Sequence, residues 1–171
     1  MNSGTNFPPV IIEIRKSLIL PEEIGVFAVR DLSEQQLIGD ASLLGESIFF
    51  SWEQFNSFDE ETRAKIMAYC LGNERGFYTL SNLNYLSVPW NMNHSCEGNV
   101  GFDSEGNFVT IRSIKKGEEL LWDYGLGESN PNFTMPCKCG SKICRGVITG
   151  NDWKNNDFRH RNLKYMLPEL K

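Results

Sequence analysis

Apolar residues in this chain gather in short runs that are separated by polar turns. The runs are rich in β-branched and aromatic residues, which is typical of strands joined by short connections. The expected strands cover residues 10–14, 25–30, 47–50, 108–111 and 118–124. Residues 102–103 and 108–111 flank the sequence Ser-Glu-Gly-Asn, so we expect a hairpin there.

The pattern turns helical in the stretch that follows residue 50. Two segments there match the capping box, in which a serine and the third following residue satisfy each other's backbone amides. The two segments are Ser51-Trp52-Glu53-Gln54 and Ser57-Phe58-Asp59-Glu60. The second is expected to begin the only good helix of the chain, which runs to Leu71 and stops at Gly72-Asn73. These elements predict a fold class that is mostly β with minor α (α+β).

Composition favours one domain with a buried core. Of the 171 residues, 40% are hydrophobic and 23% are charged, which argues against disorder. The net charge of −5 argues against a nucleic-acid-binding protein and suits a basic protein partner. No apolar stretch is long enough for a membrane span and no signal peptide is apparent, so we expect a reducing location, cytoplasmic or nuclear.

Cysteine spacing gives the strongest chemical signal. Residues 137–144 carry three thiols in a C-x-C-x₄-C array, one short of the four that close a tetrahedral zinc site. Cys96 can supply the fourth, which would make a structural site with no open position for water. The alternatives are incidental cysteines in a turn and a redox pair of Cys137 and Cys139. Cys70 falls in the expected helix, where a buried, inert thiol is the expected role.

Four motifs follow one another along the chain. They are Glu23-Ile24-Gly25-Val26-Phe27-Ala28, Asn93-His94-Ser95-Cys96, Leu121-Trp122-Asp123-Tyr124-Gly125 and the cysteine array that ends in Cys144-Arg145-Gly146. Together they resemble the SET domain with its cysteine-rich post-SET extension, the fold of S-adenosylmethionine-dependent protein lysine methyltransferases. The resemblance covers roughly residues 14–153, and the ending at residues 148–153 is similar to small bacterial-type members.

The resemblance implies a SET fold, with several small curved sheets around a C-terminal pseudoknot and one helical insertion. It implies S-adenosylmethionine as cofactor, Zn²⁺ as a structural metal, and Tyr124 as the catalytic residue that orients the lysine amine. The implied cofactor-binding residues are Ile24, Gly25, Val26, Asn93 and His94, the substrate-channel residues are Trp122, Tyr78 and Tyr85, and the metal ligands are Cys96, Cys137, Cys139 and Cys144. For each, an ordinary structural role is the alternative, such as a strand glycine or a core tyrosine.

Three positions depart from the family pattern. Glu23 stands where a first glycine is usual, and Trp90-Asn91-Met92 replaces the usual Arg-Phe, so both changes bear on cofactor affinity. Trp122 stands where family members usually carry Phe or Tyr, and its larger side chain is expected to favour low-order methylation.

The resemblance also implies a division of the chain. Residues 1–9 are expected to be a flexible tail, 10–127 the SET domain with its helical insertion at about 46–85, 128–150 the post-SET zinc segment, and 151–171 a C-terminal extension. The expected function is methyl transfer to a lysine ε-amine of a histone-like or other basic protein. The alternative is a catalytically weak module that binds basic tails. Neither nucleic acid nor membrane is expected as a direct partner.

Overall fold

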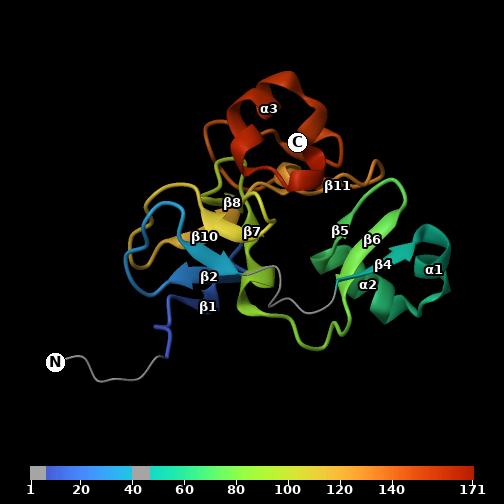
Figure 1. Ribbon diagram of the computed structural model, residues 1–171, viewed down its shortest axis with the longest axis horizontal. Helices are drawn as coiled ribbons and strands as arrows, with labels where there is room; N and C mark the ends of the chain where they lie inside the picture. Colours follow the sequence, from blue (N-terminus) through green and yellow to red (C-terminus); the bar gives the residue numbers. More distant parts are fainter. Residues whose placement is uncertain (1–6, 40–46) are drawn as a thin grey trace.

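The structure is a computed structural model that describes residues 7–39 and 47–171. Three small sheets and a few short helices make up these parts of the chain (Figure 1). The fold is mostly β with few helices, as the sequence predicts. None of the helices in the described ranges combines the length and the apolar character needed to cross a membrane. Most of the predicted tail, residues 1–6, lies outside these ranges, as does residue 46 of the predicted insertion.

The largest sheet joins the N-terminal strands to the second half of the chain. Its order is β1-β2-β10-β8-β9-β3, and β7 also pairs with β10. The strands are β1 (Ile12–Lys16), β2 (Ile24–Ala28), β3 (Leu37–Gly39), β7 (Asn93–His94), β8 (Val100–Phe102), β9 (Phe108–Thr110) and β10 (Glu119–Trp122). The predicted strands appear here with ends shifted by a residue or two, and the predicted hairpin is β8–β9.

Strand β10 is central to the sheet and to the core. It runs antiparallel to β2 and parallel to β7 and β8, so it passes between the N-terminal hairpin and the Asn-His motif. Leu120 is fully buried and packs in the main core with Val26 and Val100. Trp122, the last residue of the strand, packs against the rings of Phe102 and Phe108. Burial on both faces therefore fixes the position from which the chain turns at residue 123.

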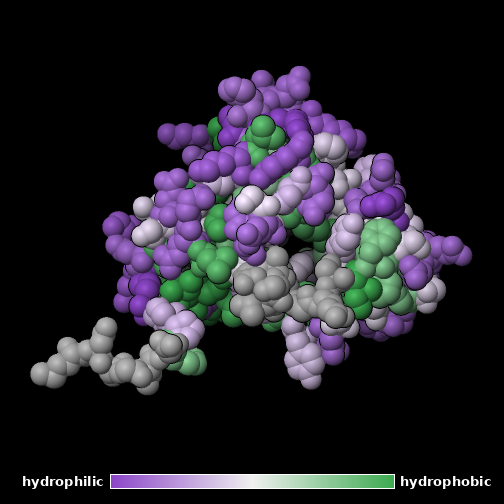
Figure 2. All heavy atoms as spheres, in the orientation of Figure 1, coloured by the Kyte–Doolittle hydropathy of each residue, from purple (hydrophilic) through white to green (hydrophobic). Residues whose placement is uncertain are grey.

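The predicted insertion forms a lobe of its own at the right of Figure 1. It contains β4 (Ser47–Ser51), α1 (Trp52–Ser57), α2 (Glu60–Tyr69), β5 (Leu71–Gly72) and β6 (Gly76–Leu80). Its three strands make a separate sheet, and Phe55, Ile66, Cys70 and Phe77 make a separate core. Apolar side chains also gather on the outside of this lobe in Figure 2.

The helix ends of the insertion confirm one predicted cap and correct the other. The capping box at Ser51–Gln54 is present and begins α1. The second prediction was wrong, because Asp59 and not Ser57 caps α2. Ser57 ends α1 instead, where its hydroxyl donates to a carbonyl of the preceding turn at 2.6 Å. Helix α2 ends at Tyr69, before its predicted end at Leu71.

The chain beyond residue 127 forms a small hairpin and a helical segment at the top of Figure 1. The hairpin pairs β11 (Thr134–Pro136) with β12 (Val147–Thr149), and α3 (Asn156–Asn162) follows. Helix α3 was not predicted, so α2 is not the only regular helix. Phe158, Met166 and Leu170 bury this segment in the main core. Single-turn 3₁₀ helices lie at Val88–Asn91, Tyr124–Leu126, Asp152–Lys154, Leu163–Tyr165 and Pro168–Leu170.

Candidate active site and metal centre

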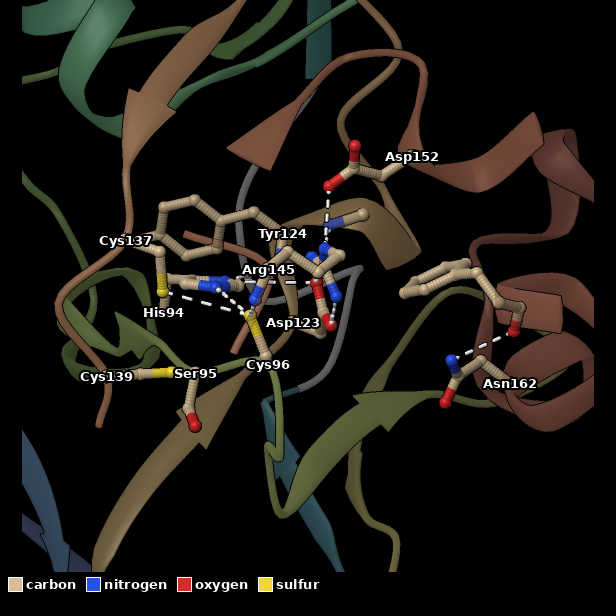
Figure 3. Close-up of polar contacts among 12 residues, drawn as sticks. His94, Ser95, Cys96, Asp123, Tyr124, Cys137, Cys139, Arg145, Asp152 and Asn162 are labelled. Atoms are coloured by element: carbon tan, nitrogen blue, oxygen red, sulfur yellow. Dashed lines mark hydrogen bonds and ion pairs between the residues drawn. The ribbon is translucent and has the colours of Figure 1, made fainter. Parts of the chain in front are cut away.

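Parallel pairing of β7 with β10 brings the Asn-His motif beside the predicted catalytic tyrosine. Asn93 pairs with Leu121 and His94 pairs with Trp122, so the turn after β10 places Tyr124 against the histidine. The Tyr124 backbone N–H donates to His94 Nδ1 at 3.1 Å, and the two ring centroids lie 5.1 Å apart (Figure 3). Residues 30 positions apart in the sequence thus form one unit.

The hydroxyl of Tyr124 is held as a protonated phenol. It donates to the Met92 carbonyl oxygen at 3.3 Å. Burial raises the pKa of Tyr124 to about 12, and the neighbouring Tyr69 and the charge of Glu23 add to this increase. At neutral pH the hydroxyl is therefore protonated and able to donate a hydrogen bond.

His94 links the tyrosine to a cysteine. Because Nδ1 accepts the Tyr124 N–H, the ring proton lies on Nε2, which is 3.4 Å from Cys96 Sγ and can donate to it. Burial lowers the pKa of His94 to about 4, although nearby Asp123 opposes this effect. The neutral imidazole therefore connects the two residues by hydrogen bonds, one to the Cys96 thiol and one from the Tyr124 backbone.

The four predicted metal ligands converge. The Sγ atoms of Cys96, Cys137, Cys139 and Cys144 all lie within 4.8 Å of one another. The sulfurs of Cys96 and Cys137 are 3.8 Å apart. Four sulfurs bound to one zinc at about 2.3 Å would be about 3.8 Å apart in a tetrahedron, so this spacing fits a four-thiolate site.

Backbone N–H groups of the cysteine loop donate hydrogen bonds to two of the sulfurs. Cys96 follows β7, while the other three thiols lie in the loop between β11 and β12. The Arg145 N–H donates to Cys96 Sγ at 3.3 Å, and the Gly146 N–H donates to Cys144 Sγ at 3.4 Å. Gly146 adopts a φ of 73°, a left-handed conformation that suits glycine. Such N–H donors stabilise thiolate ligands.

Arg145 connects the cysteine loop to the turn that carries Tyr124. Its guanidinium donates to both oxygens of Asp123 at 2.6 Å and to Asp152 at 2.9 Å (Figure 3). The guanidinium also lies over the Phe158 ring at 5.1 Å. The Asp123 side chain is only 7% exposed, so this bidentate pair is largely shielded from water.

Loss of this pair is expected to destabilise the protein. Arg145→Gln leaves the buried Asp123 carboxylate without its cation, which should cost about 3 kcal/mol of unfolding free energy. Urea denaturation in zinc-containing buffer measures the change. Arg112→Gln is the control, because the exposed pair with Glu118 should contribute about 0.5 kcal/mol or less. Equal losses in the two variants would contradict the role given to Arg145.

Two separate cavities meet at Tyr124. The smaller, about 180 Å³, is lined by Ile19, Leu20, Asn93, His94, Tyr124, Met135, Pro136, Lys138 and Cys139. The larger, about 420 Å³, is mainly apolar, and its lining includes Met92, Trp122 and Tyr78. Tyr124 is the one residue in the described part of the chain that lines both.

Several predicted site residues lie away from these cavities. Ile24, Gly25 and Val26 of β2 line neither cavity. Gly25 has a different constraint, since a Cβ there would collide with the Glu119 carboxylate. Tyr85 is 80% exposed and lines neither cavity, whereas the other two predicted channel residues line the larger.

No motif in the sequence pointed to the buried Glu119. Its carboxylate accepts from Ser17 Oγ at 2.7 Å, from the Leu18 N–H at 2.8 Å and from Asn93 Nδ2 at 3.2 Å. It therefore holds Asn93 and the turn that supplies Ile19 and Leu20 to the smaller cavity. Lys138 of the cysteine loop also lines that cavity.

The arrangement defines a site where two separate cavities share one tyrosine, beside a cluster that can hold a metal. A family model described as "SET domain" matches residues 23–125, more than half of the chain. The chain therefore belongs to the SET domain family.

Curated relatives and solved structures are similar to parts of the chain. Histone-lysine N-methyltransferase ash1 of Drosophila melanogaster is 39% identical over 66 residues, which cover 34% of this chain and 3% of that protein. Histone-lysine N-methyltransferase trr of the same organism is 28% identical over 131 residues, covering 71% of this chain and 5% of that protein. The chain thus spans a few per cent of these relatives. Polycomb repressive complex 2 of Chaetomium thermophilum is 24% identical with a TM-score of 0.49, covering 71% of this chain and 16% of that chain.

Proposed function

We propose that this chain is an S-adenosylmethionine-dependent methyltransferase that acts on a lysine ε-amine of a protein. The observation that carries the proposal is the position of Tyr124 between the two cavities. In the proposed arrangement the cofactor occupies the smaller cavity and the lysine side chain enters the larger one. The names of the relatives support the same reaction class.

The smaller cavity fits one end of the cofactor. Its volume of about 180 Å³ is below the range of about 300–1,000 Å³ of pockets that enclose a whole drug-sized ligand. Lys138 offers an ammonium group that suits an amino-acid carboxylate, while Ile19 and Leu20 offer apolar contacts. Asn93 Nδ2 already donates to the Ile24 carbonyl and to Glu119, so its amide oxygen suits the α-ammonium of the cofactor. When bound, S-adenosylmethionine supplies a methyl group on a sulfonium sulfur.

The chain's own task is to present a neutral amine in line with that methyl group. With a reference pKa near 10.4, a lysine is neutral at pH 7 only about once in a thousand molecules, a deficit of about 4–5 kcal/mol. The apolar larger cavity disfavours the ammonium form. The Tyr124 hydroxyl and the Met92 carbonyl oxygen would orient the amine, since they already lie within 3.3 Å of each other.

The four thiols are proposed to hold a structural Zn²⁺. Four thiolates fill the coordination sphere, so the metal has no open position for chemistry. A redox pair of Cys137 and Cys139 would leave Cys96 and Cys144 converging without a role. The loop carries Lys138 and Cys139, which line the smaller cavity, so the metal would shape one wall of the cofactor site. These features support residues 128–150 as a post-SET unit beside a SET domain at 10–127.

The proposed substrate is a lysine-containing basic protein, histone-like or otherwise. The net charge of −5 suits such a partner. The proposed location is a reducing compartment, cytoplasmic or nuclear, where thiols remain available to a metal.

Calorimetry with S-adenosylhomocysteine tests the proposal against a catalytically weak module that binds basic tails. Glu23, in the place of a usual glycine, and the small volume of the proposed cofactor cavity, about 180 Å³, favour that second function. An active enzyme should bind S-adenosylhomocysteine at one equivalent per chain. Absence of binding to the zinc-loaded protein would favour the module and contradict the enzyme.

Trp122→Phe is expected to change the methylation state of the product. Trp122 is 8% exposed, lines the larger cavity and packs against Tyr124 with ring centroids 4.8 Å apart. Its bulk should limit the unaltered protein to low-order methylation, and the smaller ring should allow further rounds. Mass spectrometry of a lysine peptide at equal turnover measures this.

Trp52→Phe is the matched control for that experiment, because Trp52 packs in the separate core of the insertion. Its product distribution should equal that of the unaltered protein. Trimethyllysine made by the unaltered protein would contradict the crowding argument.

A further inference from the structure

The larger cavity carries ionisable groups of one sign. Its lining contains three glutamates and, among the described residues, no lysine, arginine or histidine. Glu105 and Glu169 are exposed to solvent, whereas Glu128 is only 5% exposed. A buried carboxylate in a mainly apolar wall is costly unless something compensates its charge. The buried carboxylate of Glu128 therefore makes this cavity different from one lined by apolar side chains alone.

Glu128 lies one turn beyond Tyr124. Its backbone N–H donates to the Tyr124 carbonyl oxygen at 2.8 Å. Its carboxylate accepts one bond from the Gly72 N–H at 3.1 Å and one from the Asn130 N–H at 2.7 Å. These two bonds fix the direction of the side chain and leave further lone pairs on both oxygens.

Among the described residues, the Glu128 carboxylate has no cationic partner. In residues 7–39 and 47–171, no lysine, arginine or histidine forms an ion pair with Glu128. Burial raises the pKa of Glu128 to about 7, although the backbone hydrogen bonds from Gly72 and Asn130 oppose this. A cationic ligand in the cavity would stabilise the ionised form.

A second, independent observation also points to a ligand. The indole N–H of Trp90, another lining residue, is buried and has no hydrogen-bond partner within the described part of the chain. A buried donor without a partner is uncommon, and a small shift of the ring toward the cavity would let a carbonyl oxygen of a bound peptide accept from it. The cavity thus offers an unpaired anion and an unpaired donor, together with aromatic rings that attract cations.

We propose that Glu128 is the specificity-determining anchor that binds an alkylammonium side chain in the larger cavity. The identification of that side chain as the substrate lysine rests on the proposed methyltransferase function. The carboxylate attracts the ammonium form as it enters, while the apolar walls contact its methylene groups. Loss of the Glu128 charge is therefore expected to raise KM for the substrate and to leave kcat the same or higher, because an ion pair with Glu128 opposes the later loss of the proton from the amine.

The test uses two small probes of equal length, n-butylammonium and 1-butanol, and needs neither cofactor nor methyl transfer. The indole N–H signals of Trp90 and Trp122 in NMR titrations report on binding in the cavity. The unaltered protein should bind n-butylammonium at least tenfold more tightly than 1-butanol. In Glu128→Gln this ratio should fall to about one, with the dispersed indole N–H signals of the four tryptophans retained as a check of folding.

A complementary variant covers the case in which Glu128→Gln fails to fold. The double variant Glu105→Gln/Glu169→Gln removes the two exposed carboxylates, so only Glu128 remains to attract a cation. It should keep the tenfold preference. Loss of the preference in that variant, or no preference in the unaltered protein, would overturn the proposal. Methyl transfer observed without the preference would refute the anchor alone, whereas the preference without transfer would refute the proposed function alone.

Discussion

Chelation of the metal is expected to release the cysteine loop and to abolish cofactor binding. No residue from 137 to 147 is buried, so the loop has no apolar core of its own. A structural zinc contributes on the order of 10 kcal/mol of folding free energy, which is enough to order such a segment. Because Lys138 and Cys139 line the smaller cavity, release of the loop removes one of its walls.

Two measurements, hydrogen exchange and calorimetry, detect the release of the loop. Amide hydrogen exchange across residues 134–149 should accelerate after a strong chelator is added, while β8 and β9 should keep their protection. Calorimetry should show at least a hundredfold loss of affinity for S-adenosylhomocysteine, and added Zn²⁺ should restore it.

Cysteine variants separate this effect from a general loss of stability. Cys96→Ser and Cys144→Ser should each lose the stoichiometric metal. Cys70→Ala should keep it, because Cys70 is buried in the insertion core, where burial raises the pKa of its thiol to about 11. Purified protein that contains no metal would contradict the structural zinc site. So would amide exchange and S-adenosylhomocysteine affinity that do not change when the chelator is added.

Tyr124→Phe is expected to reduce methyl transfer by about 100-fold or more. The variant removes the hydroxyl at the boundary of the two cavities and keeps the ring that packs against His94 and Trp122. Only the bond to the Met92 carbonyl is lost, which should cost about 1 kcal/mol of stability. Single-turnover transfer from methyl-labelled cofactor measures the rate, and calorimetry should show nearly unchanged cofactor affinity.

Tyr165→Phe is the control for this variant. Tyr165 lies in the C-terminal segment and lines neither cavity, so transfer should stay within a factor of two of the unaltered protein. Full activity of Tyr124→Phe would contradict the role of the phenol.

Local signals in the sequence predicted the strands and the first helix cap well. Runs of β-branched and aromatic residues located β1, β2 and β4, and the turn sequence Ser-Glu-Gly-Asn located the β8–β9 hairpin. Ser51 with Gln54 located the start of α1. Ser57 and Asp59 are both residue types that favour helix N-caps. Phe58 has an extended backbone that ends α1, so α2 begins after it and Asp59 is its N-cap. Helix α3 was missed because burial of Phe158 in the main core supports it, and that contact is long-range.

The order of the motifs predicted which candidate site residues come together. The four cysteines converge, and Tyr124 lies beside Asn93 and His94, as the order of motifs implies. The prediction for Gly25 did not include the Glu119 carboxylate that packs against it. Glu128 could not be predicted, because its burial depends on contacts with a distant lobe of the chain.

The most direct test of the central claim is methyl transfer to lysine by the zinc-loaded protein. Labelled S-adenosylmethionine is incubated with a mixture of lysine-rich proteins, which are then hydrolysed and separated into amino acids. The account predicts label in methyllysine with the unaltered protein and at least 100-fold less with Tyr124→Phe. Equal label with both proteins, or none with the unaltered protein, would contradict it.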